Sequence, residues 1–408
     1  MKGLFRMMIL CLATVPACGY FSIGARDNMQ KGRGAEYNSS VITGTVVGAG
    51  GGPVMVLARP VEGGAAPPQD YVMLERPGPF MLYVPAGRYR LYSIRDYNGN
   101  GVFESTEVSG VCRSGGATAG IMAVEDDVWT GVVIREGAGA VGPLSPSFRL
   151  RHDRSALPCQ PANGETARIY DERFCAANAE VGWWSPSTFM RAFGAAIYFT
   201  REYEPSKIPV LFVHGAQGSP QNWAYFLFRL DARRYQPWFY YYPSGIRLGL
   251  ASRLLFEALK DLRKRFGFSA ICITAHSMGG LITRDMLSRF DLKREGIDVK
   301  VYVTLASPWG GFESADRAFL FPSKRLPVWY DVTSASAFID RALRAKLPQG
   351  VSYYLFYGTA DGVAEGRALD ERVYTGAKEK FAFDVDHEGI LSDRRVFDKY
   401  REVLGRRR

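Results

Sequence analysis

The stretch Ile271-Cys272-Ile273-Thr274-Ala275-His276-Ser277-Met278-Gly279-Gly280 joins an apolar, strand-like run to small residues that continue as a helix-like segment. This layout is typical of a nucleophile elbow, in which a serine lies on a strained turn between a strand and a helix. Small residues two before and two after the serine are a steric need, because the turn brings neighbouring backbone very close. Ala275 stands where glycine is usual. The pattern predicts Ser277 as a nucleophile.

The chain contains only four histidines, so the general base can be sought almost by elimination. His276 adjoins the serine and is expected to point away from it. His152 lies far upstream, and His214 belongs to a different motif. His387, downstream of the serine, is therefore the predicted base.

Length, composition and charge limit the number of domains and the kinds of partner that the chain can have. The chain has 408 residues, of which 47% are hydrophobic and 23% charged, and its net charge is +10. This length predicts two domains, and the charged fraction is ordinary for a soluble protein. The basic residues are spread along the chain rather than gathered in a basic-aromatic stripe, so we expect no nucleic-acid partner. A basic surface would be weakly attracted to anionic lipid headgroups.

The N-terminus has the pattern of an export signal. Lys2 and Arg6 precede the apolar run 7–15, which is too short to span a bilayer. A small residue before Cys18 resembles the lipobox of bacterial lipoproteins, which predicts a signal peptide over 1–17, a lipidated Cys18 and a tether over 18–38. A plain secretory signal or an uncleaved anchor is the alternative. Either way we expect the mature chain to leave the cytoplasm. With the lipid anchor it would lie in the cell envelope, and Gly19 after Cys18 favours the outer membrane in a cell with two membranes.

The remaining cysteines fit an exported protein. Cys159 and Cys175 flank a polar stretch and could form a disulfide, although spacing alone does not establish the pair. Cys272, inside the elbow strand, is expected to be a small buried hydrophobe.

Residues 39–136 show a β pattern. Short apolar runs separated by Gly/Pro turns predict a small all-β sandwich. The phrase 80–94, with Pro85-Ala86-Gly87-Arg88-Tyr89 between two strands, resembles the carboxypeptidase-regulatory or transthyretin-like modules of secreted proteins.

One loop of this β module matches a calcium-loop pattern with alternating oxygen ligands and a glycine at the bend. A structural calcium ion is one expectation there, and a hairpin turn rich in Asn and Gly is the other. The predicted ligands are Asp96, Asn98, Asn100 and Glu107.

A Gly/Ala/Pro-rich linker is predicted over 137–150, and a different architecture over 151–408. Strand-like runs at 208–213, 269–274 and 299–305 alternate with helix-like segments such as 250–266 and 279–290. This alternation predicts an α/β fold with a mostly parallel central sheet.

A second motif follows the apolar strand 209–213, which ends in His214-Gly215-Ala216-Gln217. A loop at the carboxyl end of a parallel strand can direct backbone N–H groups at a reacting carbonyl. The predicted oxyanion donors are the N–H groups of Ala216 and Met278, with that of Gln217 as the alternative to Ala216. The predicted substrate contacts are His214, Gly215, Gln217 and Trp309. Trp309 begins a segment, from 308 to about 349, whose aromatic residues could form an apolar lid or acyl-binding wall, although ordinary core packing would equally explain them. These residues include Phe312, 319–322, 328–330 and Phe338.

Four motifs together resemble the α/β-hydrolase superfamily, and within it bacterial lipases and esterases related to the GPI-inositol-deacylase and triacylglycerol-lipase groups. They are Pro-Val-Leu-Phe-Val-His-Gly (209–215), Tyr-Tyr-Pro-Ser-Gly (241–245), Ala-His-Ser-Met-Gly-Gly (275–280) and Leu-Ala-Ser-Pro-Trp-Gly-Gly (305–311). The resemblance implies the triad order serine, acid, histidine and places the acid at Asp361, with Asp384 and Asp386 as alternatives.

The resemblance implies a serine esterase or lipase that acts on acyl or lipid esters through an acyl-enzyme and needs no cofactor for catalysis. An acyltransferase with the same triad is one alternative. A non-catalytic envelope-binding or structural lipoprotein is another.

Overall fold

The computed structural model describes residues 39–62, 68–114, 117–118, 120–137, 142–145, 147–151, 163–312, 315–316, 326–363 and 376–406. The predicted signal peptide 1–17 and tether 18–38 lie outside these ranges, as do His152 and Cys159. Cys175 forms no disulfide with any described residue. No helix in the described part of the chain has the length and apolarity needed to cross a membrane.

The N-terminal part is all β, as the turn spacing predicts. Its strands form one connected ladder in the order β3-β2-β5-β7-β10-β1-β4, with β8 and β9 beside it and β6 paired with β11. The end strands β3 and β4 pack side by side, so the ladder curls around an apolar core. The strands are Ser40–Val47 (β1), Val54–Pro60 (β2), Asp70–Leu74 (β3), Pro79–Val84 (β4), Gly87–Arg95 (β5), Val102–Glu104 (β6), Val108–Ser114 (β7), Ala117–Thr118 (β8), Ile121–Ala123 (β9), Val128–Glu136 (β10) and Arg149–Arg151 (β11).

The C-terminal part has a seven-stranded sheet in the order β12-β14-β13-β15-β16-β17-β18. Only the edge strand β12 runs antiparallel to its neighbour. The strands are Ala196–Phe199 (β12), Ile208–Val213 (β13), Tyr235–Tyr241 (β14), Ala270–His276 (β15), Asp298–Leu305 (β16), Ser352–Gly358 (β17) and Glu379–Phe383 (β18). The helices are Glu172–Phe174 (η1), Ala176–Trp184 (α2), Pro186–Ala192 (α3), Pro220–Trp223 (η2), Ala224–Leu227 (α4), Leu248–Phe266 (α5), Met278–Arg289 (α6), Trp329–Val332 (α8), Ala337–Arg344 (α9), Gly389–Leu391 (η4) and Arg394–Gly405 (α11).

Both faces of this sheet are covered by helices. Leu211 and Ile273 point into the core shared with α5 and α6, whereas Phe212 and Cys272 point into the core shared with α4 and α11. Alternate residues of a strand face opposite sides, so two-sided burial requires the continuous apolar runs seen in β13 and β15. This strand order, with the sharp turn after the middle strand β15, is the α/β-hydrolase fold, and the predicted fold class is confirmed.

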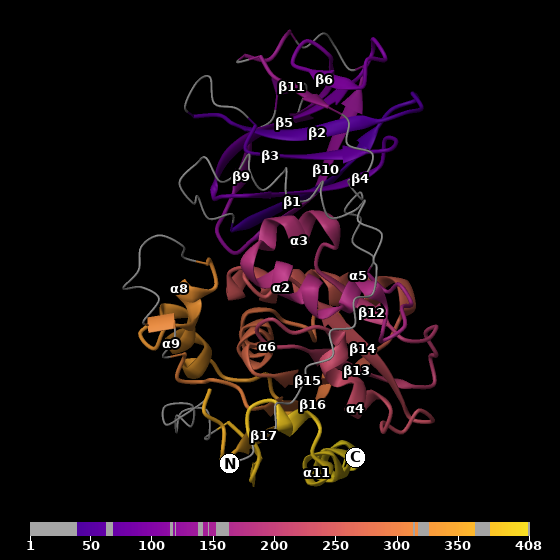
Figure 1. Cartoon of the computed structure of the whole chain (residues 1–408). Helices are drawn as coiled ribbons and strands as arrows, with labels where there is room; N and C mark the ends of the chain where they lie inside the picture. The colour runs from indigo at the N-terminus through magenta and orange to yellow at the C-terminus, as the bar shows by residue number, and fades with distance from the viewer. Residues whose placement is uncertain are drawn as a thin grey trace, which may run out of the picture.

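The β module packs directly on the α/β unit. In Figure 1 it lies above α2, α3 and α5, with the central sheet below these helices. Val41, Tyr83 and Val128 of the module belong to the same apolar cluster as Met190 and Leu254. The two parts therefore share a hydrophobic core.

Ion pairs border this junction. Arg191 of α3 binds the buried carboxylate of Asp70 at 2.7 Å. Arg247, just before α5, pairs with Asp331 of α8 at 2.9 Å and with Glu125 of the module. Arg247 thus connects three segments that are far apart in the sequence.

The first residues of β1 lie at the same junction. The carbonyl of Ser39 accepts a hydrogen bond from the N–H of Asp126 at 2.9 Å. A Cβ atom added to Gly249, in the first turn of α5, would lie 2.2 Å from Oδ2 of Asp126. The turn that carries Asp126 is therefore wedged between the start of β1 and the start of α5.

Candidate active site

Ser277 lies on the turn between β15 and α6 with φ = 53°. A positive φ is costly for a residue with a side chain, and it projects the serine out of the strand-to-helix turn. The N–H of Ser277 is held by the carbonyl of Leu305 at 2.9 Å. This backbone therefore has the strain that the sequence pattern predicts for an elbow.

The small residues around the serine are required by close contacts. A Cβ atom on Gly279 would lie 2.6 Å from the carbonyl oxygens of Val213 and His214. One on Gly280 would lie 2.0 Å from Oγ of Ser307. Helix α6 can begin directly after Ser277 only because these positions lack side chains.

The structure brings Ser277, His387 and Asp361 together, from three different strand ends. Nε2 of His387 lies 2.9 Å from Oγ of Ser277, and Nδ1 lies 3.0 and 2.9 Å from the two carboxylate oxygens of Asp361. The His387 and Asp361 side chains are 12% and 4% exposed. This is the nucleophile, base and orienting-acid geometry of a serine triad.

The alternative acid at 386 has a different local partner. Oδ1 of Asp386 accepts a hydrogen bond from the N–H of Gly389, the first residue of η4, at 2.6 Å. Asp384 contributes its backbone carbonyl to Arg395 at 3.2 Å. Of the three candidate carboxylates, Asp361 is the one that binds the His387 ring.

Two loops bring the acid to the histidine. Thr359 and Ala360, after β17, donate backbone hydrogen bonds to the carbonyls of Phe383 and Val385 at 2.8 and 3.2 Å. A Cβ atom on Gly358 would lie 2.3 Å from the Val385 carbonyl. Gly358 therefore lets the loops meet, a role that the sequence did not reveal although Gly358 begins the segment that carries the predicted acid.

His276 supports the His387 loop from the elbow. Its Nε2 lies 3.0 Å from the backbone carbonyl of His387, so this ring nitrogen carries a proton and donates. Burial, followed by the proximity of His387, lowers the pKa of His276 to about 3. The ring is therefore neutral at working pH. It does not contact Ser277 through a hydrogen bond, in line with its expected direction.

The predicted oxyanion loop passes close to the serine. A Cβ atom on Gly215 would lie 2.7 Å from Cβ and 3.2 Å from Oγ of Ser277. Within the described ranges, the N–H groups of Ala216 and Met278 donate to no other residue. The N–H of Gln217, in contrast, donates to Oγ of Ser244 at 2.9 Å. Among the described residues, none therefore accepts from the predicted donor pair, whereas the N–H of Gln217 is bonded to Ser244.

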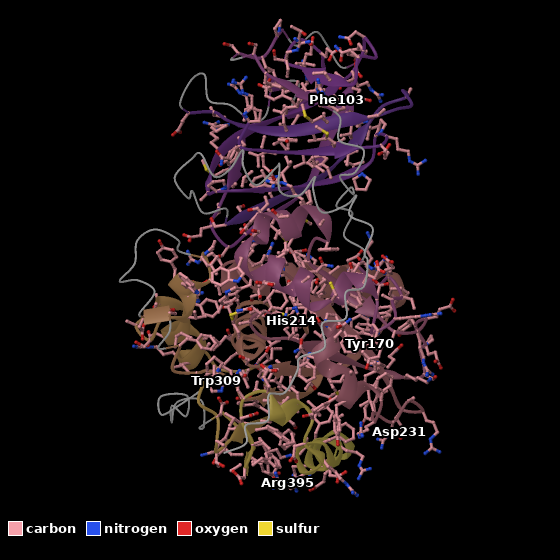
Figure 2. The ribbon with its side chains drawn as sticks, viewed as in Figure 1. Phe103, Tyr170, His214, Asp231, Trp309 and Arg395 are labelled. Carbon is pink, nitrogen blue, oxygen red and sulfur yellow. The ribbon has the colours of Figure 1, made fainter. Side chains whose placement is uncertain are left out.

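Two of the predicted substrate contacts are buried. Figure 2 shows His214 and Trp309 inside the α/β unit, and each is 1% exposed. The His214 ring stacks on Tyr242, with centroids 4.3 Å apart, and burial lowers its pKa to about 4. Trp309 lies in the main apolar cluster. In this structure both side chains are therefore packed in the interior, next to the ends of their strands.

The predicted lid is described only in part. Residues 319–322 lie outside the described ranges. Trp329 of α8 is partly exposed. Its ring contacts that of the exposed Trp184 of α2 edge to face, with the ring centroids 6.4 Å apart. Phe338 is buried in the core, which is the ordinary packing that the sequence left open.

The side-chain oxygens of the predicted calcium ligands accept hydrogen bonds from backbone N–H groups of the same loop. Asp96 accepts the N–H groups of Asn100 and Gly101 at 3.1 and 2.7 Å. Glu107 accepts those of Tyr97 and Glu104, both at 3.0 Å. The oxygens of Asn98 and Asn100 likewise accept N–H groups of the loop, at 3.0 and 2.7 Å. The oxygen donors suit calcium chemically, but the same oxygens already satisfy the turn as hydrogen-bond acceptors.

Residues 204–341 match the protein family described as "Putative serine esterase (DUF676)". Similar solved structures include the mature lipase BlEst2 of Bacillus licheniformis (18% identity, TM-score 0.39, covering 50% of this chain and 94% of that one). They also include lipase B of Aspergillus fumigatus (16% identity, TM-score 0.41, 55% and 58%). No curated protein matches the sequence. The α/β-hydrolase fold of the C-terminal part rests on its own strand order. The family match covers the part of this fold that includes Ser277 and the turn after β15.

Proposed function

We propose that this protein is a serine hydrolase that cleaves carboxylic esters, with Ser277, His387 and Asp361 as its catalytic triad. The observation that carries the proposal is the continuous hydrogen-bonded series from Oγ of Ser277 through both ring nitrogens of His387 to Asp361. The family match over 204–341 supports the same reaction class.

The geometry supports a definite order of proton movements. With Nδ1–H donated to Asp361, Nε2 of His387 is the basic nitrogen and accepts the Ser277 proton during attack on the ester carbonyl. The proton then passes to the leaving alcohol, and an acyl-enzyme remains. Water, activated by the same nitrogen, hydrolyses that ester and restores Ser277.

The negative charge that forms on the carbonyl oxygen needs donors. The N–H groups of Met278 and Ala216 are the proposed pair, because they flank Ser277 and donate to no other described residue. Losing one such donor typically lowers kcat about 100- to 1000-fold.

The proposal is tested with the purified full-length protein on p-nitrophenyl esters from acetate to palmitate, beside Ser277→Ala. We expect turnover by the wild type alone and labelling of Ser277 by a fluorophosphonate probe. Equal rates for the two proteins, or a label on another serine, would refute the assignment. Adding an acceptor alcohol and analysing the products separates hydrolysis from acyl transfer.

We further propose that the protein is exported and anchored in the cell envelope through a lipidated Cys18, on the strength of the sequence of residues 1–19. Incorporation of labelled palmitate into the wild type but not into Cys18→Ala would support this. The likeness of 80–94 to transthyretin-like modules leads us to propose that the β module stabilises or positions the enzyme. A structural calcium ion in the 96–107 loop is a separate proposal, with no part in the chemistry.

A further inference from the structure

The loop that carries the proposed oxyanion donor Ala216 has a strained backbone. Gln217 has φ = 52°, in the left-handed region that residues with side chains seldom adopt. The N–H of Gly218 donates to the carbonyl of Gly215 at 3.2 Å, which closes the turn. Nδ1 of His214 also lies 2.9 Å from the Gly215 carbonyl, so both bonds within the loop meet at this one carbonyl. The N–H of the strained Gln217 is bonded from outside the loop.

The contacts come from the segment after the neighbouring strand β14. Oγ of Ser244 accepts the N–H of the strained Gln217 at 2.9 Å. The hydroxyl of Tyr242 donates to the carbonyl of His214 at 2.9 Å, and its ring stacks on the His214 ring with an interplanar angle of 13°. Ser244 and Tyr242 are both buried. They hold the loop on either side of Ala216.

The segment that provides these contacts is itself held at several points. The N–H of Gly245 donates to the carbonyl of Gly182 at 2.9 Å, and its carbonyl accepts the N–H of Val328 at 3.2 Å. A Cβ atom on Gly245 would lie 2.1 Å from the carbonyl oxygen of Trp183. Ser244 is therefore fixed between the oxyanion loop on one side and α2 and the start of α8 on the other.

We infer that Ser244 is a positioning residue for the oxyanion hole. By holding the N–H of Gln217, it fixes the Ala216–Gln217 peptide and, through it, the direction of the Ala216 N–H beside Ser277. Tyr242 provides the second support. Neither residue contacts the triad through a hydrogen bond, and the inference rests on the proposed serine hydrolase function.

The inference predicts a specific kinetic signature. A donor to the oxyanion acts in the transition state and hardly at all on the bound ester, so its misplacement lowers kcat and leaves KM nearly unchanged. We expect Ser244→Ala to lower kcat tenfold to a hundredfold, less than the full loss of a donor, because the loop retains its Tyr242 support. The pH profile of the reaction should be unchanged, because Ser244 forms no hydrogen bond with a triad residue.

The experiment compares full-length wild type, Ser244→Ala, Ser244→Thr and Tyr242→Phe on a short-chain p-nitrophenyl ester. Ser244→Thr retains the hydroxyl acceptor and should recover most of kcat. Tyr242→Phe removes one hydroxyl and should also lower kcat at constant KM, which provides a second variant if Ser244→Ala does not fold. Ser252→Ala is the matched control: Ser252 is equally buried, in α5, and its hydroxyl has no partner in the described part of the chain.

A second readout is independent of turnover. Hydrogen–deuterium exchange of a peptide covering 214–219 should be faster in Ser244→Ala than in wild type, since the Gln217 amide loses its acceptor. Unchanged exchange, unchanged kcat, or equal losses in Ser244→Ala and Ser252→Ala would each overturn the inference. If wild type and Ser277→Ala hydrolyse no ester, the proposed function fails, and the exchange result alone then decides whether Ser244 holds the loop.

Discussion

The carboxyl group of Asp126 gives the junction between the β module and the α/β unit a dependence on pH. Asp126 lies in the turn before β10 with φ = 58°, against the first turn of α5. Its Oδ1 is buried and has no hydrogen-bond partner within the described residues. Burial, reinforced by the nearby Asp331 and opposed by Arg247, raises the pKa of Asp126 to about 7.

The direction of the effect follows from the two states. Unfolded aspartate has a pKa of about 3.9, so the folded protein binds this proton more tightly than the unfolded chain does. The contribution of Asp126 to stability is therefore greatest below about pH 4, falls as pH rises toward about 7, and is constant above that. A pKa that is about three higher in the folded state than in the unfolded chain changes the free energy of unfolding by about 4 kcal/mol between low and high pH. The variant Asp126→Asn, whose side chain is always neutral, should be more stable than wild type by most of this amount at pH 8 and by almost nothing at pH 4.

The assay is urea unfolding of wild type and variant at pH 4 and pH 8. Asp127→Asn is the matched control, because Asp127 is the next residue of the same turn and its carboxylate forms a partly exposed ion pair with Arg253 at 3.3 Å. That variant should lose up to about 1 kcal/mol. The reasoning would be refuted if Asp126→Asn were no more stable than wild type at pH 8, or if its gain in the free energy of unfolding were the same at pH 4 and pH 8.

Three further outcomes are expected. Ser277→Gly should abolish turnover yet raise the free energy of unfolding by about 1 kcal/mol, because glycine adopts φ = 53° without strain; a lower melting temperature would contradict this. Gly279→Ala should destabilise the protein by about 1–3 kcal/mol, measured by urea unfolding, since its Cβ would meet two backbone carbonyls at 2.6 Å; wild-type stability would argue against the elbow geometry. EDTA should leave ester hydrolysis unchanged because the proposed chemistry uses no metal, and activity lost to EDTA and restored by calcium would overturn that expectation.

The central part of the fold could be predicted from the sequence. Strand β13 is a continuous apolar run of the kind that only a sheet buried on both faces requires, and its predicted range 208–213 matches the structure. The elbow could be recognised because its small residues are demanded by local sterics. Edge strand β18 was missed, since its residues alternate between partly and fully exposed positions and form no apolar run.

The candidate site was predictable where a role depends on local chemistry, and not where it depends on packing. With so few histidines, His387 could be singled out by its position in the chain. The burial of His214 and Trp309 could not be foreseen, because it depends on which segments cover the strand ends. The 96–107 loop shows the same limit in another way: one pattern of oxygen side chains serves a metal site and a self-bonded turn equally well.

The position at which β1 begins has a mechanical consequence. Ser39 is hydrogen bonded to the turn that is wedged against α5, so the chain joins the folded body at the junction and not at the far end of the module, where Phe103 lies (Figure 2). If the protein is tethered through residues 18–38, which reach roughly 70 Å when fully extended, tension would be applied near the waist of the molecule. Because the β module and the α/β unit share a hydrophobic core, the two would then move together about this point.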